Sequence, residues 1–220
     1  MTSEEYYRVI AIDGPAASGK SSVARELARR LGFAYVNSGA MYRAVTWYVL
    51  EHQINPGDAA RIAALVQSAS IVCDLRDNQS QIQIDQVDPT PHLRDDQVNN
   101  SVSQVSTVPQ VRAILVEKMH LYARAQDLVM EGRDIGSVVF PDTPFKFYID
   151  ASPEVRLRRR AAEGQRDEIA ARDRADSGRR SSPLVIAEDA LVIDSSNLTI
   201  DGVVGEIIGR LKMSGLKGID

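Results

Sequence analysis

The stretch Gly14–Ser22 constrains this chain more than any other feature of the sequence. It reads G-x-x-x-x-G-K-S followed by a second serine. Such a motif carries weight only when a strand enters it and a helix leaves it. Both conditions are met, because Arg8–Asp13 is a short apolar run rich in β-branched residues and apolar side chains recur at helical spacing over Val23–Leu31. We therefore predict a phosphate-binding loop, followed by a helix that ends at Gly32.

The chemistry expected of this loop follows from its residue types. Gly14 and Gly19 allow a close backbone approach, so that successive N–H groups can point into one concavity at the positive end of a helix. Lys20 can reach the terminal phosphates of a nucleotide, and the Ser21 hydroxyl can coordinate the accompanying Mg²⁺. The predicted ATP-binding residues are those of the whole loop: Gly14, Pro15, Ala16, Ala17, Ser18, Gly19, Lys20, Ser21 and Ser22.

Composition and charge limit the classes of protein to which this chain can belong. The 220 residues have a net charge of -4, which does not favour a general nucleic-acid-binding surface. Between Arg156 and Arg180, however, nine Arg and no Lys accompany five acids, and arginine suits forked recognition of phosphate. Cys73 is the single cysteine, and neither a membrane-spanning run nor a secretion signal is recognisable. We therefore expect a cytoplasmic protein with no nucleic-acid or membrane partner.

Short apolar strands alternate with helices along the chain, which predicts a parallel sheet with helices on both faces. After the strand that enters the phosphate loop, the predicted strands are Phe33–Asn37, Leu128–Glu131, Lys146–Asp150 and Ala190–Asp194. The fold class is thus α/β with a five-stranded parallel sheet, in a single domain over residues 1–220. The predicted later helices are Ala40–Leu50 with Ser38 as N-cap, Ala60–Ala69, one opening at Val108-Pro109, an Arg-rich one starting at Ser152-Pro153, and Asp201–Leu211.

Residues 70–95 differ in character from the rest. Two strand-like runs, Ser70–Leu75 and Gln81–Asp85, flank a predicted turn at Asp77–Ser80, which indicates a small antiparallel insert. Residues 93–107 are polar and serine-rich, and no helix is predicted there.

The carboxyl ends of parallel strands meet at one edge of the sheet, where ligands collect. We therefore expect the phosphate loop, Ser38-Gly39, Gly132–Asp134, the turn after Asp150 and Asp194–Ser196 to converge. Many arginines together with Mg²⁺ suit transfer of a phosphoryl group between two anions. The sequence lacks the N-K-x-D element of a GTPase. Glu131 is a weak candidate for the acidic residue of a motor ATPase. A sugar hydroxyl as phosphoryl acceptor would need a base such as Asp, and Asp134 could serve as that base, so this alternative stays open.

Several blocks match one family in the right order over about residues 8–210: Asp13-Gly14-Pro15, Gly19-Lys20-Ser21, Ser38–Ala44, Ser103-Gln104-Val105, Val111-Arg112, Glu131–Gly136, Val138–Pro141, Arg172-Asp173, Asp176-Ser177, Arg179, Ser182-Pro183-Leu184 and Asp189–Ser195. With these blocks the chain resembles the bacterial cytidylate kinases. The resemblance implies a three-layer P-loop kinase fold with an NMP-binding insert at 70–95 and a short Arg-rich lid at 157–171. It also implies ATP-dependent phosphorylation of CMP and dCMP, with Mg²⁺, and we expect a monomer.

The family's residue roles can be carried over to matching positions. Lys20 and the loop amides would hold the ATP phosphates, with Ser21 on the metal. Arg159 and Arg160 of the lid would donate charge. The implied catalytic residues are Lys20, Arg133, Arg160 and Arg172. The implied substrate-binding residues are Arg43 and Arg133 for the phosphate of CMP, Ser103, Arg112 and Asp134 for its base with Ser38 nearby, and Arg172, Asp176 and Arg179 for its sugar and orientation.

Three departures and two alternatives remain at this point. Asn37 stands where the family commonly has Asp, Ala17 where Gly is common, and the lid is short. One alternative is a P-loop kinase for another small acceptor, either UMP or a non-nucleotide metabolite such as a sugar. The other is a nucleotide-gated or RNA-binding module that uses the Arg-rich segment, although that segment lacks interleaved aromatic residues.

Overall fold

A computed structural model describes residues 7–162, 173–174, 176–178, 182–216 and 218. The chain divides into two units. The first unit combines Met1–Val36 with Ala123–Asp220, and the second unit is Asn37–Tyr122.

The strands of the first unit are β1 (Val9–Asp13), β2 (Ala34–Asn37, whose last residue begins the second unit), β5 (Leu128–Gly132), β6 (Phe145–Asp150) and β7 (Leu191–Asp194). Strand β1 lies between β5 and β6 and runs parallel to both, and β7 runs parallel to β6. Asp13 at the end of β1 is level with Gly132 of β5 and Tyr148 of β6. All five predicted strands are confirmed, and the carboxyl ends of β1, β5 and β6 meet at one edge, as expected.

The strand count differs from the prediction. Within the described residues the sheet has seven strands in the order β3-β4-β2-β5-β1-β6-β7, where five were predicted. The two additional strands are those of the predicted antiparallel insert, β3 (Ile71–Arg76) and β4 (Gln79–Ile84). The insert was predicted to be separate from the sheet, because its alternating pattern does not indicate which strand it pairs with.

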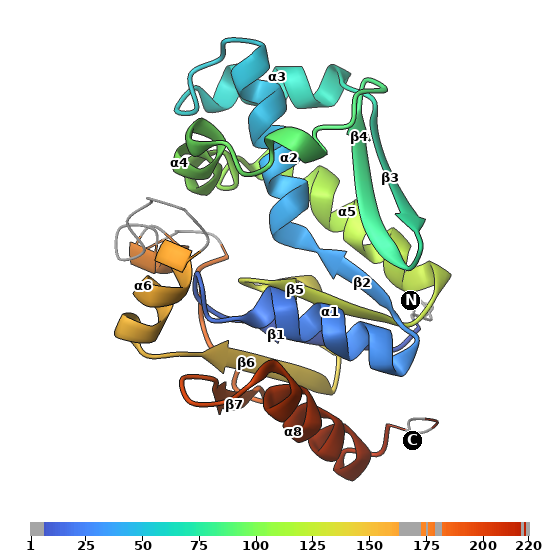
Figure 1. Cartoon of the computed structure of the whole chain (residues 1–220). Coiled ribbons are helices and arrows are strands. Elements are labelled where there is room, and N and C mark those ends of the chain that lie inside the picture. The colour runs from blue at the N-terminus through green and yellow to red at the C-terminus, as the bar shows by residue number, and fades with distance from the viewer. Residues whose placement is uncertain (1–6, 163–172, 175, 179–181, 217, 219–220) are drawn as a thin grey trace. The chain divides into compact units, whose positions relative to one another are not determined.

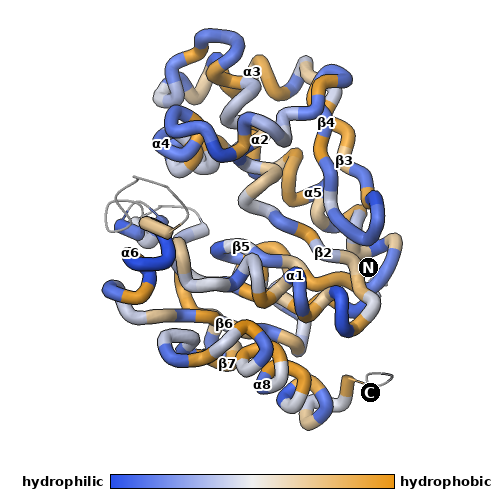
Figure 2. Tube along the Cα trace, in the orientation of Figure 1, coloured by the Kyte–Doolittle hydropathy of each residue, from blue (hydrophilic) through white to orange (hydrophobic). Residues whose placement is uncertain are grey.

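Helices cover one face of the first unit's sheet. They are α1 (Lys20–Leu31) and α8 (Ile200–Met213), while α6 (Pro153–Ala162) and the π-helical turn η2 (Ile135–Val139) follow strands β6 and β5. Helices α1 and α8 lie side by side and share one apolar core with the strands. Leu27, Ile149 and Ile207 are fully buried in this core, and each such side chain contributes about 1.5–3 kcal/mol. In Figure 2 the strands are mostly orange and α6 is largely blue, which agrees with a buried sheet and a polar helix.

Helix ends in the first unit follow the local sequence. Gly32 adopts φ 67° after the last turn of α1, a conformation that glycine reaches without strain, so the predicted helix end is confirmed. Helix α8 begins earlier than predicted because Thr199 caps it, with its hydroxyl accepting from the Gly202 amide at 3.1 Å.

The second unit consists of helices around the β3–β4 hairpin. The helices are α2 (Ser38–Glu51), α3 (Ala59–Ser68), the short 3₁₀ turn η1 (Thr90–His92), α4 (Asp96–Val105) and α5 (Pro109–Ala125). Asp77 and Asn78 both have positive φ, which makes a two-residue hairpin turn. Gln79 and Ser80 therefore belong to β4, and their predicted place in the turn was wrong. Tyr122 of α5 donates from its hydroxyl to the carbonyls of Asp74 (3.2 Å) and Gln81 (3.1 Å).

Two features of the second unit correct the prediction. The N-cap of α2 is Asn37, whose side-chain oxygen accepts from the Ala40 amide at 2.9 Å, and Ser38 is the first helical residue. Helix α4 was not predicted, because its polar and serine-rich composition hid its apolar face. Val98, Val102 and Val105 are buried at steps of four and three residues, which is helical spacing.

Among the described residues, no helix combines the length and the apolar character needed to cross a bilayer.

Candidate active site

The phosphate loop has the backbone geometry predicted for it. A Cβ atom at Gly14 would lie 2.1 Å from the carbonyl oxygen of Ile149, so β6 leaves room for glycine alone. Ala17 and Gly19 both adopt positive φ, of 58° and 88°. The requirement for glycine at Gly14 is therefore steric, whereas at Gly19 it comes from the backbone conformation.

Lys20 begins α1 with a side chain that is only 6% exposed. Its ammonium group donates to the carbonyl oxygen of Pro15 at 2.9 Å. The side chain is thus folded back across its own loop, which is where a lysine must lie to meet phosphates held by the loop amides.

Ser21 and Glu131 place two oxygen ligands beside the loop. The hydroxyl of Ser21 donates to a carboxylate oxygen of Glu131 at 2.8 Å, and the hydroxyl of Tyr35 donates to the same oxygen at 3.3 Å. Glu131 is buried near the end of β5. A serine hydroxyl and a carboxylate are hard oxygen ligands of the kind that Mg²⁺ prefers, so this pair could hold such an ion. Among the described residues, no group of three or more His, Cys, Asp or Glu is placed to hold a metal ion.

Asp13 ends β1 and is buried. Its two carboxylate oxygens accept the backbone N–H groups of Ile135 at 2.9 Å and Gly136 at 2.8 Å. Burial raises the pKa of Asp13 to about 6, although these two hydrogen bonds work in the opposite direction. Asp134 nearby also raises this pKa and Lys20 lowers it. A carboxylate at the start of the phosphate loop therefore holds the turn that follows β5.

That turn carries Arg133 and Asp134, two of the predicted substrate-binding residues. Arg133 donates from Nε to a carboxylate oxygen of Asp176 at 2.8 Å, and from Nη1 to the Gly132 carbonyl at 3.4 Å. The side chains of Arg133 and Asp176 are 16% and 3% exposed, so this ion pair is largely shielded from water. Asp134 is also buried. The structure thus brings together three of the predicted residues: the two at the turn, Arg133 and Asp134, and Asp176 from a distant segment.

Arg159 of α6 holds the other side of the loop. Its guanidinium donates to the Ser18 carbonyl at 3.1 Å, to the Ser195 hydroxyl at 3.0 Å and to the Ser195 carbonyl at 2.8 Å. The Ser195 hydroxyl also donates to the Ser18 carbonyl at 2.8 Å. Arg159 therefore links α6, the phosphate loop and the end of β7. Arg160, the neighbouring residue predicted as a charge donor, lies on α6 and is partly exposed.

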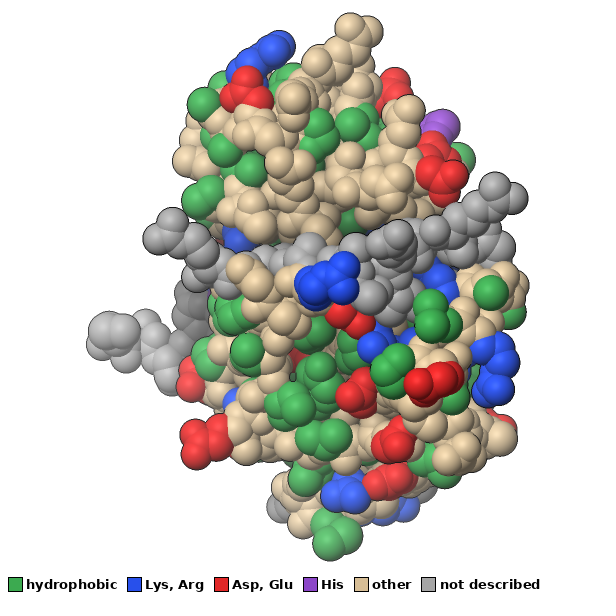
Figure 3. Space-filling model, turned by 90° about the vertical axis from the view of Figure 1, so that its left-hand side faces the viewer, with side chains coloured by type: hydrophobic (Ala, Val, Ile, Leu, Met, Phe, Trp, Pro, Cys, Tyr) green, Lys and Arg blue, Asp and Glu red, His purple; other side chains and the backbone are tan. Residues whose placement is uncertain are grey.

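A cavity of about 290 Å³ opens beside this linkage. Its walls come from the phosphate loop, the start of α1, α6 and the segment that leads from β7 into α8, including Gly19, Arg159, Leu198 and Ile200. Figure 3 turns the left-hand side of Figure 1, the side of α6, toward the viewer. Among the coloured side chains, blue basic ones are interspersed with red acidic and green apolar ones, so this face is of mixed charge.

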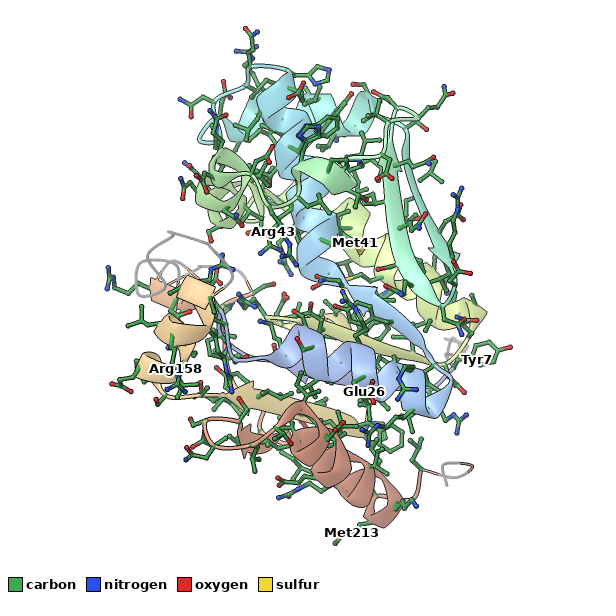
Figure 4. The ribbon with its side chains drawn as sticks, viewed as in Figure 1. Tyr7, Glu26, Met41, Arg43, Arg158 and Met213 are labelled. Atoms are coloured by element: carbon green, nitrogen blue, oxygen red, sulfur yellow. The ribbon has the colours of Figure 1, made fainter. Side chains whose placement is uncertain are left out.

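In the second unit, Arg43 and Ser103 are associated with α2 and α4. Arg43 donates from Nε to the side-chain oxygen of Asn99 at 3.3 Å, and Figure 4 shows its side chain leaving α2 on the side of α4. Asn99 is buried, and its amide nitrogen donates to the Arg94 carbonyl at 2.9 Å, which turns its oxygen toward Arg43. Ser103 follows Asn99 by one helical turn, so the two lie on the same face of α4.

Arg112 and Ser38 complete the predicted residues of the second unit. The guanidinium carbon of Arg112 lies 5.8 Å from the centre of the Tyr42 ring, which is a cation–π arrangement. Tyr42 directly precedes Arg43 in the chain. Arg112 and Ser38 are both buried. Four predicted residues thus gather around α2. Their meeting with the residues of the first unit stays a prediction.

Two predicted residues, Arg172 and Arg179, lie outside the described residues, as does most of the predicted lid. Ser195 lies beside the phosphate loop, as predicted for Asp194–Ser196, whereas the places of Asp13 and Asn99 in the network around the site were not predicted. Asp13 carries a signal in retrospect, because it is a charged residue at the end of an apolar strand. Asn99 carries none, since its contact with Arg43 depends on helix packing.

The chain is similar to known proteins over nearly its whole length. A family model described as cytidylate kinase matches residues 10–213. A cytidylate kinase of Caldanaerobacter subterraneus subsp. tengcongensis is 43% identical over 214 residues, covering 92% of this chain and 94% of the relative. A cytidylate kinase of Desulforamulus reducens is 43% identical over 213 residues, covering 92% and 96%. A crystal structure of TT1252 from Thermus thermophilus aligns with a TM-score of 0.49 and 19% identity, over 97% of this chain and 100% of that one. The family match spans nearly the whole chain and includes every described part of the site, so this protein belongs to the cytidylate kinase family.

Proposed function

We propose that this protein transfers the γ-phosphoryl group of ATP to CMP or dCMP, with Mg²⁺, giving the nucleoside diphosphate and ADP. The observation that carries the proposal is the arrangement within the first unit. There, the phosphate loop with Lys20 and the turn with Arg133 are joined through Asp13. A site with a donor-phosphate cradle and an arginine for a second phosphate suits a phosphate acceptor.

The donor nucleotide would occupy the phosphate loop and the cavity beside it. The loop amides and Lys20 would hold its phosphates. A cavity of about 290 Å³ bounded by Arg159, Leu198 and Ile200 has the size and the mixed apolar and cationic walls that suit a purine base. Ser21 and Glu131 would hold Mg²⁺, which neutralises charge on the β- and γ-phosphates during transfer.

The acceptor nucleotide would be held by residues of both units. Arg133 and Arg43 would bind its phosphate, each presented by a fixed partner, Asp176 and Asn99 respectively. The edge of cytosine offers an amino donor together with N3 and O2 acceptors, which a carboxylate, an arginine and a hydroxyl complement. The residues proposed to read it are Asp134, Arg112 and Ser103, with Ser38 nearby, and those proposed to hold the sugar side are Asp176, Arg172 and Arg179.

Chemically, a phosphate oxygen of CMP attacks the γ-phosphorus as the bond to the β,γ-bridging oxygen breaks, and ADP leaves. An ionised phosphate needs no general base, so catalysis consists of alignment and of stabilising spread negative charge. Lys20 and Arg133 would do this for the transferring group, with Arg160 and Arg172 as further charge donors.

A coupled assay of ADP release tests the proposal, with CMP, dCMP, UMP, AMP and GMP each offered as acceptor. We expect turnover with CMP and dCMP well above that with the purine monophosphates. If neither CMP nor dCMP is turned over, the proposal is rejected. Preferred turnover of UMP, or no thermal stabilisation of the protein by CMP, would favour a P-loop kinase for another acceptor, because a native-state ligand must raise the melting temperature.

A further inference from the structure

Asp13 occupies a junction between the two halves of the proposed reaction. It is the last residue of β1, and Gly14, the first residue of the phosphate loop, follows it in the chain. Its carboxylate accepts the amides of Ile135 and Gly136, at 2.9 and 2.8 Å. One side chain therefore connects, through a single peptide bond and two hydrogen bonds, the loop for the donor phosphates and the turn that presents Arg133.

The turn is packed tightly where Asp13 holds it. A Cβ atom built on Gly136 would lie 3.1 Å from Cγ of Lys146 and 3.5 Å from Cβ of Ala11. Lys146 is itself fixed by hydrogen bonds to Asp189 at 2.7 and 2.8 Å. Close packing limits how far the turn can lie from β1, and the two hydrogen bonds of Asp13 set its register along β1.

We propose that Asp13 is a positioning residue for phosphoryl transfer, whose carboxylate keeps the turn bearing Arg133 and Asp134 in register with the phosphate loop. The inference rests on the function proposed above. Reacting groups must be aligned closely, and a misplacement of about 1 Å can cost about 100-fold in rate. Arg133 follows the motion of its own backbone, so an error at Ile135 and Gly136 would move the charge that it brings to the acceptor phosphate.

An ionised carboxylate is suited to this role because it offers two acceptors to two converging N–H groups. An asparagine would offer one oxygen, and its NH₂ group would face the second N–H. The charge itself does not help folding, since burial opposes ionisation of Asp13 and raises its pKa to about 6. The charged or titratable groups that face it are Asp134, Lys20 and Tyr148, of which Lys20 alone favours the ionised form.

The test compares the variants Asp13→Asn and Asp13→Glu with the wild-type chain. We expect Asp13→Asn to fold and to lower kcat by at least about tenfold, while KM for ATP and for CMP each change by less than about threefold, because alignment rather than ground-state binding is lost. Asp13→Glu keeps the charge but moves the carboxylate by one methylene, so we expect a similar loss of kcat. A role in electrostatics alone would leave Asp13→Glu active and would contradict the proposal.

Asp127→Asn is the matched control. Asp127 also accepts a backbone N–H across the same pair of strands, that of Arg8 at 2.8 Å, but at the opposite end of the sheet. We expect it to lower thermal stability and to leave kcat unchanged. Retention of kcat within about threefold in Asp13→Asn would overturn the inference, and so would failure of that variant to fold, which would give the carboxylate a structural role. Absence of CMP turnover in the wild-type chain would instead reject the proposed function, and this inference with it.

Discussion

Two aspartates lie at opposite ends of the β1–β5 strand pair, and the protein holds them in opposite ways. Asp127, just before β5, receives the backbone amide and the guanidinium of Arg8. Asp13, at the end of β1, is more deeply buried and receives the amides of Ile135 and Gly136. One carboxylate has a full positive charge as hydrogen-bond partner, whereas the other is hydrogen-bonded to amides only partly able to replace water.

The pKa values of the two aspartates differ in direction as a result. Burial acts to raise the pKa of Asp127, but the hydrogen bonds from Arg8 outweigh it, so the pKa is lowered. For Asp13 burial outweighs the hydrogen bonds, and its pKa rises from 3.8 to about 6. At neutral pH the ionised carboxylate of Asp127 therefore stabilises the fold, whereas ionisation of Asp13 destabilises it. Proteins often retain destabilising groups at functional sites and compensate for them elsewhere in the structure.

The largest expected effect tests whether chemistry belongs to the Asp13 end of the strand pair. Lys20→Ala removes a buried ammonium group that lies across the phosphate loop. We expect kcat for CMP phosphorylation to fall by about 100- to 1,000-fold, since one preorganised charge at the transferring group is lost. The measurement is the coupled assay, with Lys212→Ala, an exposed lysine of α8, as control. Equal losses in both variants would mean that the loop is not the catalytic element.

A second effect concerns the pH dependence of stability at the same end. Because the folded pKa of Asp13 lies above its unfolded value, this group stabilises the fold when protonated, and that contribution is lost as the pH rises from about 4 through about 6. Between pH 4.5 and pH 7.5 the wild type should therefore lose about 2 kcal/mol of unfolding free energy relative to Asp13→Asn. Urea unfolding of both proteins at the two pH values measures this difference. A gap of unchanged size at the two values would show that Asp13 does not titrate as described.

Much of the first unit could be predicted because its signals are local. The strands β1, β5 and β6 are short apolar runs. The phosphate loop is recognisable from the spacing of its glycines and lysine, so the positions of Gly14 and Lys20 could be predicted. The convergence of Arg133 and Asp134 with the loop followed from the rule that parallel strands end at one edge. The pairing of Arg133 with Asp176 did not follow, because nothing in the sequence relates two segments so far apart.

Prediction failed where local signals conflict or where only packing decides. Helix α4 has three buried valines at helical spacing, but its serines and asparagines favoured a loop. Ser38 and Asn37 are both acceptable N-caps, and only the backbone geometry chooses Asn37. The hairpin was found, but its place next to β2 in the strand order depends on long-range pairing. The role of Asn99 beside Arg43 likewise depends on the packing of α2 against α4.

The smallest expected effect concerns the other end of the strand pair. Asp127→Asn removes the charge that pairs with Arg8 but leaves an oxygen for the Arg8 amide. Because the side chain of Arg8 is 40% exposed, solvent screens the pair, and we expect a loss of about 1 kcal/mol at pH 7, or about 2–4 °C in melting temperature.

The sign of the pH dependence separates the two ends of the strand pair. The folded pKa of Asp127 is depressed, so its contribution is present above the unfolded pKa of about 4 and is lost as the pH falls through the folded pKa. Thermal melts at pH 7 and near pH 3 should therefore show a larger deficit of Asp127→Asn at the higher value than at the lower, the reverse of the order expected for Asp13→Asn. A deficit of the same size near pH 3 as at pH 7 would mean that Asp127 acts through packing, and the contrast between an ion pair that stabilises the fold and a buried carboxylate that aligns the site would then be lost.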